Sequence, residues 1–145
     1  MKALVLSDTH GAVSDMLEVL KRERPDVTFF LGDYVRDIEE VYKYSDCLTF
    51  ITVRGNNDFF SDKPYTAEYV LDGKRYFATH SHLYKGKLEL SLAASERKCD
   101  VVLYGHTHIP LLETVGDITL FNPGSLRYGG TYGIIEEGKP VLKKL

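Results

Sequence analysis

The N-terminal part of the chain alternates short apolar runs with helical segments, and each apolar run ends in a polar turn. Val13–Arg24, with apolar residues at helical spacing, and Asp37–Tyr44 are the expected helices. We expect Ser14 to cap the first helix and Pro25 to end it. The order strand, helix, strand, helix, strand predicts a parallel βαβαβ unit with right-handed crossovers. The expected strands are Leu4–Leu6, Val27–Leu31 and Leu48–Val53.

The second half of the chain has a different pattern. Asp72-Gly73 separates two strand-like runs, Tyr65–Leu71 and Lys74–Thr79, and is a strong signal for a two-residue hairpin. One helix is expected at Lys87–Lys98, with Leu88, Leu92 and Ala93 or Ala94 facing inward. The remaining runs suggest mostly antiparallel hairpins. These runs are Val101–Tyr104, Leu111–Val115, Ile118–Phe121, Thr131–Glu136 and Lys139–Leu145.

These elements together predict an α/β fold. We expect a four-layer α-β-β-α sandwich, in which two mixed sheets pack together and helices cover both outer faces. Because the sequence contains no linker, repeat or low-complexity segment, a single domain spanning residues 1–145 is expected.

Charge and hydropathy exclude several classes of protein. The net charge is −3, from 21 acidic and 18 basic residues that are interspersed along the sequence. A stable nucleic-acid complex is therefore not expected, because it would need a basic face. The longest apolar runs have about six residues, whereas a membrane-spanning helix needs about 20. Without a signal-peptide pattern, we expect a cytoplasmic protein with no membrane contact. Cys47 and Cys99 lie outside any CxxC spacing and are expected to be buried and unpaired.

Polar residues follow the strand-like runs and carry the chemistry. Of the five histidines, all but His10 occur in His-x-His pairs. In parallel sheets, functional residues gather at the carboxyl ends of the strands, where these residues are expected to lie. The motifs are Asp8-x-His10, Gly32-Asp33, Gly55-Asn56-Asn57-Asp58, His80-x-His82 and Gly105-His106-x-His108.

This set of side chains is suited to divalent metal ions. Carboxylate, amide and imidazole donors without a thiolate fit Mn²⁺, Fe²⁺, Zn²⁺, Ni²⁺ or Co²⁺. The donors are too many for one tetrahedral ion, and they suit two ions about 3.5–4 Å apart that share a bridging carboxylate. Such a pair can orient a phosphate and offset the charge on its oxygens, so phosphoryl chemistry is expected.

Each residue also has a simpler interpretation. Asp8 could cap the following helix, Asp33 could cap a turn, and Asn56 could be a turn residue. The sequence leaves three roles possible for His82: supporting a ligand, contacting phosphate or acting as an acid. Arg54 either contacts phosphate or is simply solvated. Asp37 and Asp58 are expected to orient backbone or ligands rather than to bind metal.

In this order, the five motifs resemble those of the calcineurin-like metallophosphoesterases. Val53-Arg54-Gly55-Asn56, Gly105-His106-Thr107-His108 and Asn122-Pro123-Gly124-Ser125 are similar to the small phosphodiesterase branch, which also contains the retromer subunit Vps29. The resemblance runs from about Lys2 to Ser125. It implies two divalent metal ions, with Mn²⁺ favoured over Ni²⁺, Fe²⁺, Co²⁺ and Zn²⁺. The implied ligands of one ion are Asp8, His10, Asp33 and His108, and those of the second are Asp33 as the bridge, Asn56, His80 and His106.

The sequence departs from the family pattern at two positions. Asn57 stands where many members have a histidine that protonates the leaving group, and an amide cannot deliver a proton near pH 7. The small branch often has a cysteine there, so activity is still expected. We expect either a preference for good leaving groups or a proton from His82 or a metal-bound water. Ser81 replaces the usual glycine between the paired histidines.

The leading hypothesis is a metal-dependent phosphodiesterase, in which a hydroxide bridging two metal ions attacks a small phosphodiester substrate. The candidate catalytic residues are His82, Asn57 and Arg54. The alternative is a Vps29-like protein-binding scaffold with a vestigial or regulatory metal site. A nuclease is disfavoured, because the short chain leaves no room for a DNA-clamping domain and the overall charge is not basic. Strand edges and the many tyrosines make a homodimer or homotetramer a further expectation.

Overall fold

The first sheet contains the N-terminal βαβαβ unit. The computed structural model describes residues 1–47 and 49–145, and its first sheet has the strand order β10-β9-β1-β2-β3. β1, β2 and β3 run parallel, whereas β9 is antiparallel to both β1 and β10. The bounds are β1 (Lys2–Leu6), α1 (Val13–Glu23), β2 (Val27–Phe30), α2 (Arg36–Tyr42), β3 (Phe50–Thr52), β9 (Thr131–Glu136) and β10 (Lys139–Lys144). The predicted parallel unit is confirmed, and Leu48 of the predicted third strand lies outside the described residues.

The second sheet has the order β4-β5-β6-β8-β7. The predicted hairpin of β4 and β5 is confirmed, with the turn at Asp72-Gly73. β5, β6 and β8 run parallel, so the prediction of mostly antiparallel hairpins is wrong at the centre of this sheet. The reason is that α3 is a crossover between β5 and β6, and that the chain passes through the edge strand β7 between β6 and β8. The bounds are β4 (Thr66–Leu71), β5 (Lys74–Thr79), α3 (Lys87–Glu96), β6 (Val101–Tyr104), β7 (Leu111–Val115), β8 (Ile118–Asn122) and α4 (Leu126–Gly129).

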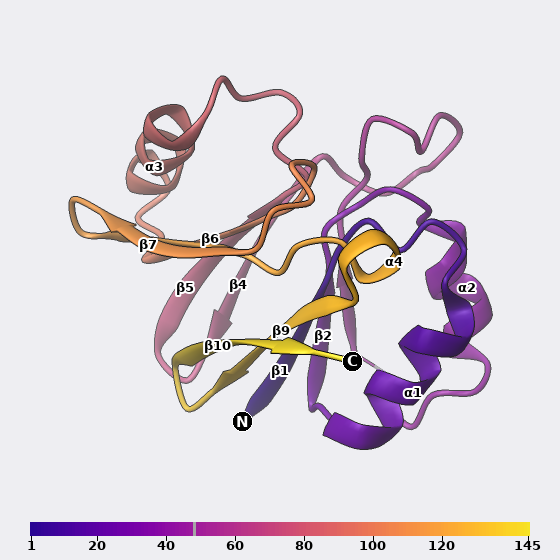
Figure 1. Cartoon of the computed structure of the whole chain (residues 1–145). Helices are drawn as coiled ribbons and strands as arrows, with labels where there is room; N and C mark the ends of the chain where they lie inside the picture. Colours follow the sequence, from indigo (N-terminus) through magenta and orange to yellow (C-terminus); the bar gives the residue numbers. More distant parts are fainter. Residues whose placement is uncertain (48) are drawn as a thin grey trace.

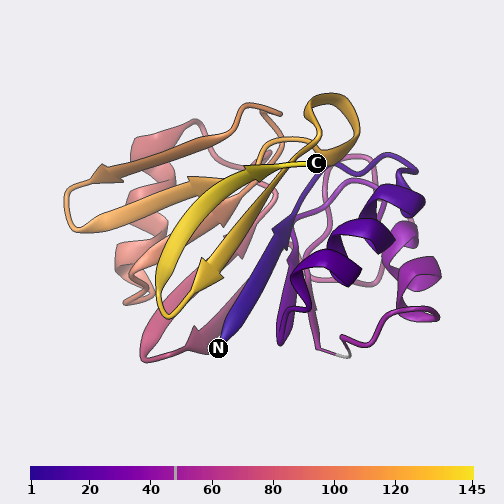
Figure 2. The same ribbon diagram turned by 60° about the horizontal axis from the view of Figure 1, so that its bottom comes forward.

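The two sheets face each other, and helices cover their outer faces (Figures 1 and 2). Residues from both sheets, such as Phe29 and Phe121, form the central core. A second cluster packs α1 and α2 on the first sheet, and a third packs α3 on the second. The predicted four-layer sandwich is therefore confirmed.

The helix boundaries differ from the predictions by a few residues. Ser14 does not cap α1, because the helix already begins at Val13 and Ala12 occupies the cap position. The amides of Ala12 and Val13 are satisfied by the carbonyls of Thr9 and Gly11 instead. α2 is shorter than predicted, and α3 ends at Glu96. The short helix α4 was not predicted, since four residues are too few to show a helical period.

The buried face of α3 is also not the predicted one. Leu88 and Leu92 are 67% and 53% exposed, whereas Leu90 and Ala94 are buried against the second sheet. Apolar residues occur around the whole circumference of this helix, so their spacing did not determine the buried face. One of Ala93 and Ala94 was expected to face inward, and both are buried. The predicted burial of both cysteines is confirmed.

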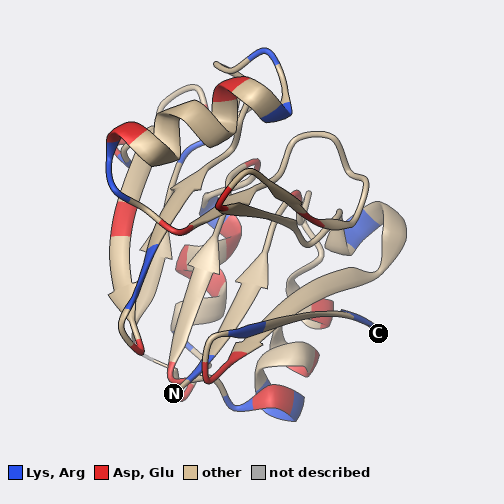
Figure 3. Cartoon of the chain, turned by 90° about the vertical axis from the view of Figure 1, so that its left-hand side faces the viewer, with Lys and Arg blue, Asp and Glu red and all other residues tan. Residues whose placement is uncertain are grey.

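Charged residues of both signs are interspersed over the side of the molecule seen in Figure 3, as the sequence predicted. Within the described residues, none of the helices has the length and apolar character needed to cross a membrane.

Candidate metal centre

The predicted ligands meet where the two sheets converge. Asp8 and His10 follow β1, Asp33 follows β2, and the remaining side chains follow β3, β5 and β6. β2 and β6 are buried throughout, β1 is buried from Ala3 on, and β3 and β5 are buried toward their carboxyl ends, where the ligand-bearing loops begin. The structure brings all of the predicted ligands together, in two groups described below.

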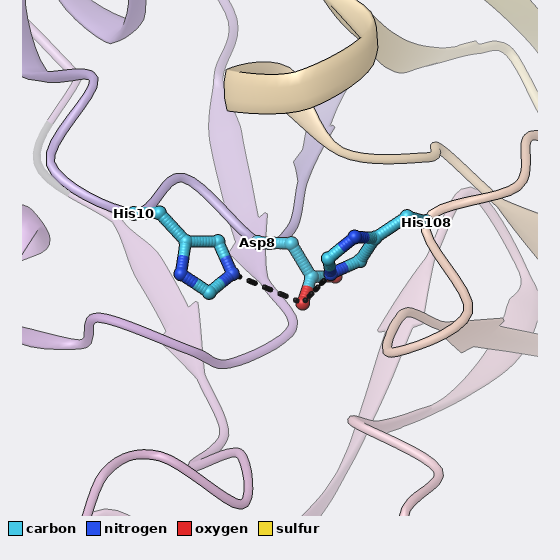
Figure 4. Close-up of side chains that lie close together, drawn as sticks. All are labelled: Asp8, His10 and His108. Carbon is cyan, nitrogen blue, oxygen red and sulfur yellow. Dashed lines mark hydrogen bonds and ion pairs between the residues drawn. The ribbon is translucent and has the colours of Figure 1, made fainter.

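The first group contains Asp8, His10 and His108. The Oδ1 atom of Asp8 lies 3.2 Å from Nε2 of His108 and 3.8 Å from Nε2 of His10. Figure 4 shows both rings directed at this one carboxylate oxygen. Nε2 of His10 is buried and has no hydrogen-bond partner among the described residues. A buried imidazole nitrogen without a partner is costly, and a bound cation would satisfy it.

The second group contains Asn56, His80 and His106. Nε2 of His80 lies 2.9 Å from Oδ1 of Asn56 and 3.3 Å from Nδ1 of His106. Asp33 lies between the two groups: its Oδ2 is 3.7 Å from Nε2 of His10, and its Oδ1 is 3.5 Å from Nε2 of His80. Each oxygen of this carboxylate therefore faces one group, which is the arrangement a bridging ligand needs.

The spacing of the donor atoms fits a shared cation. Two ligand atoms that each lie about 2.0–2.2 Å from one ion are themselves about 2.9–3.6 Å apart. The contacts of His80 with Asn56, His106 and Asp33 all fall within this range, as does that of His108 with Asp8. The contacts of His10, at 3.7 and 3.8 Å, are slightly longer than this range. The residues present therefore fit divalent metal ions in donor chemistry, and all but His10 also fit in spacing.

Hydrogen bonds hold the ligands in their orientations. Oδ2 of Asp8 accepts hydrogen bonds from the Ser7 hydroxyl and the His106 amide, which leaves Oδ1 available to a cation. Asn57 donates from its backbone amide and its side chain to the two oxygens of Asp33, at 3.1 and 2.9 Å. Asn57 thus contacts the carboxylate between the two groups.

Asp37 and Asp58 orient the ligand-bearing loops, as predicted. The Asp58 carboxylate accepts hydrogen bonds from the amides of Asp33, Val35 and Gly55. The Asp37 carboxylate accepts from the Thr9 hydroxyl and the Gly11 amide beside His10. Neither belongs to the ligand groups found among the described residues.

Glycine precedes three of the ligands, Asp33, Asn56 and His106, for two different structural reasons. Gly32 has φ +100°, a conformation that glycine adopts without strain. Gly55 and Gly105 have no positive φ, but a Cβ on Gly55 would collide with Asp33 and one on Gly105 with Ser7 and Asp8. These two positions therefore need glycine for close approach rather than for a positive φ.

Several ligand residues themselves adopt positive φ, among them Asp8 (53°), Asp33 (63°), His106 (72°) and His108 (63°). Such backbone strain costs about 1–3 kcal/mol per residue and collects at functional sites. Ser81 also has a positive φ of 86°, so the serine occupies a backbone position that would suit glycine.

His82 lies beside the centre rather than within either group. Its ring is 5.5 Å from that of His80 and 6.3 Å from that of His106, and its buried Nδ1 has no partner among the described residues. Burial and the neighbouring histidines lower the pKa of His82. Burial and His80 likewise lower the pKa of His106. A lowered pKa favours the neutral ring, the form in which imidazole binds metal.

Arg54 is engaged by its own loop. Its terminal nitrogens donate to the carbonyls of Ser61, Asp58 and Phe59, and its guanidinium lies 4.8 Å from the centre of the Tyr65 ring. These contacts differ from both roles considered from the sequence, which were contact with phosphate and simple solvation. Arg54 fastens the loop that follows Asn57.

Three residues outside the predicted ligand set also shape this centre. Ser125 donates from its hydroxyl to the carbonyl of Asp8, and Asn122 donates to the carbonyl of Gly105. The Tyr128 ring lies 5.2 Å from that of His10 and stacks on that of His108 at 5.5 Å. Asn122 and Ser125 belong to the Asn-Pro-Gly-Ser motif, which supported the family resemblance but had no physical role assigned to it from the sequence.

Comparison with known proteins identifies the family. A sequence model described as the calcineurin-like phosphoesterase superfamily domain matches residues 1–136. The chain belongs to this superfamily. The predicted family is therefore confirmed, and the fold and the ordered motifs agree with it.

Relatives named as phosphoesterases cover most of the chain. A probable metallophosphoesterase of Mycoplasma pneumoniae is 35% identical over 131 residues, which are 86% of this chain and 79% of that protein. Phosphodiesterase YfcE of Escherichia coli is 33% identical over an alignment of 165 positions, which covers 94% of this chain and 88% of the relative. A crystal structure of Vps29 from Entamoeba histolytica complexed with Zn²⁺ has the same fold, with a TM-score of 0.80, 17% identity, and coverage of 100% of this chain and 98% of that one.

Proposed function

We propose that this protein is a metal-dependent phosphodiesterase that holds two divalent cations. Mn²⁺ is the favoured ion, with Ni²⁺, Fe²⁺, Co²⁺ and Zn²⁺ as alternatives. The observation that carries the proposal is the position of Asp33, whose two carboxylate oxygens face the two ligand groups separately. The proposed ligands are Asp8, His10, Asp33 and His108 on one side, and Asp33, Asn56, His80 and His106 on the other.

The protein's contribution is to position the reacting groups. When bound, the two cations supply a water of lowered pKa and offset negative charge on the phosphate oxygens. Ser7 and the His106 amide fix Asp8, and Asn57 fixes Asp33, so that the ligand atoms need little reorganisation. The backbone strain at the ligand residues is consistent with a preorganised site.

The proposed substrate is a small phosphodiester with a good leaving group. Asn57 offers an amide where a proton donor would be needed, and an amide does not donate a proton near pH 7. His82 is the one histidine outside the proposed ligand groups, but burial and the neighbouring histidines lower its pKa, so it is a poor source of this proton near pH 7. The name of the Escherichia coli relative, a phosphodiesterase, supports a diester over a monoester.

The protein-binding scaffold is the less favoured function. A scaffold released from catalysis is under no constraint to keep its metal ligands, whereas this chain retains a donor at every predicted position. The buried, unpaired Nε2 of His10 is also hard to explain without a cation.

The test is a panel of divalent metals assayed with matched aryl phosphodiester and monoester substrates. We expect uptake of about two metal ions per chain and faster hydrolysis of the diester. Asp33→Asn and His108→Ala should abolish turnover and retain the circular-dichroism spectrum of the parent. Parent-like activity in both variants would contradict the assignment, and a protein that binds no metal and is inactive with every ion would favour the scaffold.

A further inference from the structure

A large cleft opens beside the metal centre on the side of His10. Its volume is about 580 Å³, and His10 and Asn57 form the part of its lining that adjoins the centre. The rest of the lining includes Tyr34, Arg36 and Phe60. The proposed mechanism uses the metal ligands but none of these three side chains. A phosphodiester carries two ester groups, and a phosphate held at the centre would extend one of them into this space.

Tyr34 is held in the cleft at a conformational cost. It adopts a φ of +71°, which is strained for an aromatic residue. The Asp58 carboxylate fixes this conformation, because it binds the amides of Asp33 and Val35 on either side. The result is that the Tyr34 ring lies 4.9 Å from the His10 ring, at the boundary between the cleft and the metal centre.

Arg36 lies over Tyr34. Its guanidinium carbon is 4.6 Å from the centre of the Tyr34 ring, a cation–π contact that holds the side chain in place. Among the described residues, no hydrogen bond or ion pair to this guanidinium is found, although Glu39 lines the same cleft. Arg36 therefore offers a fixed planar cation whose N–H groups are available to a ligand.

Two further aromatic rings of the cleft lining are exposed. Phe59 is 74% exposed and Phe60 is fully exposed, and both line the cleft. Their loop is not free to bury them elsewhere, because Arg54 donates to the carbonyls of Asp58, Phe59 and Ser61. Exposed apolar rings held in this way beside a cavity are typical of a ligand-binding surface.

We propose that this cleft binds a planar aromatic ring carried by one ester group of the phosphodiester. The ring stacks on the aromatic surface of Phe60 and Tyr34, with Arg36 beside it. An aryl ester and a nucleoside both supply such a ring, and the shared chemistry is the flat π-face. The assignment rests on the proposed function, since it takes the phosphate to be held at the metal centre.

The test is direct binding to the metal-loaded protein, measured by calorimetry. Methyl phosphate, phenyl phosphate and adenosine 5′-monophosphate share a phosphate monoester and differ in the ring. Base–aromatic stacking predicts that a ring-bearing ligand binds about tenfold or more tightly than methyl phosphate. A gain for phenyl phosphate alone assigns the cleft to aryl esters, and a gain that includes adenosine 5′-monophosphate assigns it to nucleosides.

The variants Phe60→Ala and Arg36→Ala should remove this gain, measured as the ratio of affinities for ring-bearing and methyl ligands. Both side chains are exposed, so neither change disturbs the core. Tyr44→Ala is the control, since Tyr44 is 72% exposed and lies outside the cleft lining. Equal affinities for all three ligands, or a gain that survives in both variants, would overturn the proposal. Hydrolysis of an aryl diester is measured separately. Activity without a preference for ring-bearing ligands contradicts only the ring-binding role of the cleft, whereas such a preference without activity contradicts only the proposed phosphodiesterase function.

Discussion

Nδ1 of His80 lies 2.8 Å from the backbone carbonyl oxygen of Leu31, a residue 49 positions earlier in the chain. Because a carbonyl can only accept, Nδ1 carries the proton and Nε2 presents its lone pair toward Asn56 and Asp33. The contact joins the end of β5 in one sheet to the end of β2 in the other. The orientation of this ligand therefore depends on how the two sheets pack.

His80→Ala should weaken metal binding at the second ligand group by at least 10–100-fold, roughly the loss seen when a supporting partner of a metal ligand is removed. It should also lower the free energy of unfolding by about 1–3 kcal/mol, because the buried Leu31 carbonyl loses its partner. Calorimetric titration with Mn²⁺ and urea denaturation measure the two effects. His82→Ala is the matched control, since His82 is in neither ligand group, and it should change metal affinity by only a few-fold. Equal losses in the two variants would contradict the assignment of His80.

Asn57→His should relieve the dependence on a good leaving group. The amide of Asn57 donates to Asp33 at 2.9 Å, so a histidine there would lie beside the reacting phosphate. General acid catalysis predicts an increase in kcat of up to about 10²-fold for diesters of poorly acidic alcohols, and little change for p-nitrophenyl esters. The measurement is the slope of log kcat against leaving-group pKa, with Asn57→Gln as the control that keeps the amide. An identical slope in the parent and Asn57→His would show that the proton comes from elsewhere.

Gly105→Ala should damage the first ligand group through a steric collision. A Cβ at this position would collide with the Ser7 hydroxyl and lie 2.9 Å from Oδ2 of Asp8, where it would displace the hydrogen bond between these two residues. We expect a loss of about 1–3 kcal/mol in the free energy of unfolding, together with weaker Mn²⁺ binding. Gly129→Ala should change stability by less than about 1 kcal/mol, because the nearest atom to its Cβ would be 3.6 Å away. Denaturation and metal titration of both variants check this; a Gly105→Ala protein with the parent's affinity would refute it.

Most of the ligands could be predicted because they follow the carboxyl ends of apolar strands within a few residues. Asp8, Asp33 and His80 mark strand ends in the sequence itself, and parallel strands bring such ends to one edge. The residues that support them carry no such local signal. Ser125 reaches the Asp8 carbonyl from 117 positions away, and nothing near Ser125 in the sequence specifies that partner.

The fold was predicted from the sequence to about the same extent as the metal centre. Strand order and the family resemblance led to two mixed sheets flanked by helices, but a strand's apolar pattern does not name its neighbours. β9 follows β8 in the chain yet pairs with β1 in the other sheet, and its burial on both faces would suit either position. The prediction of the buried face of α3 was wrong for a related reason. Leu88 and Leu92 share one side of the helix, but Leu90 and Ala94 are the residues that pack against the sheet.

Glu23 forms a buried ionic cluster that ties α1 to the first sheet. Its carboxylate accepts a hydrogen bond from the Tyr132 hydroxyl at 2.6 Å and contacts the ammonium groups of Lys2 and Lys143 at 3.0 and 3.3 Å. Burial raises the pKa of Glu23, but the hydrogen bonds from Tyr132, Lys2 and Lys143 together lower it by more. The folded-state pKa is therefore below the ordinary value, and as pH falls the unfolded chain takes up this proton first.

The stabilisation from Glu23 should accordingly be complete above about pH 5, beyond the ordinary glutamate pKa of about 4.3, and should be lost as pH falls through the lower folded-state pKa. Glu23→Gln should lower the free energy of unfolding at pH 7 by about 1–3 kcal/mol, and this deficit should shrink as the pH approaches 3. Urea denaturation from pH 7 to pH 3, with a chelator present throughout, measures the difference. Glu18→Gln on the same helix is the control. The Glu18 side chain is 59% exposed and, among the described residues, pairs only with Arg22, so the effect should stay below about 0.5 kcal/mol. A Glu23→Gln deficit that is constant across this range would mean that the cluster stabilises through packing rather than charge.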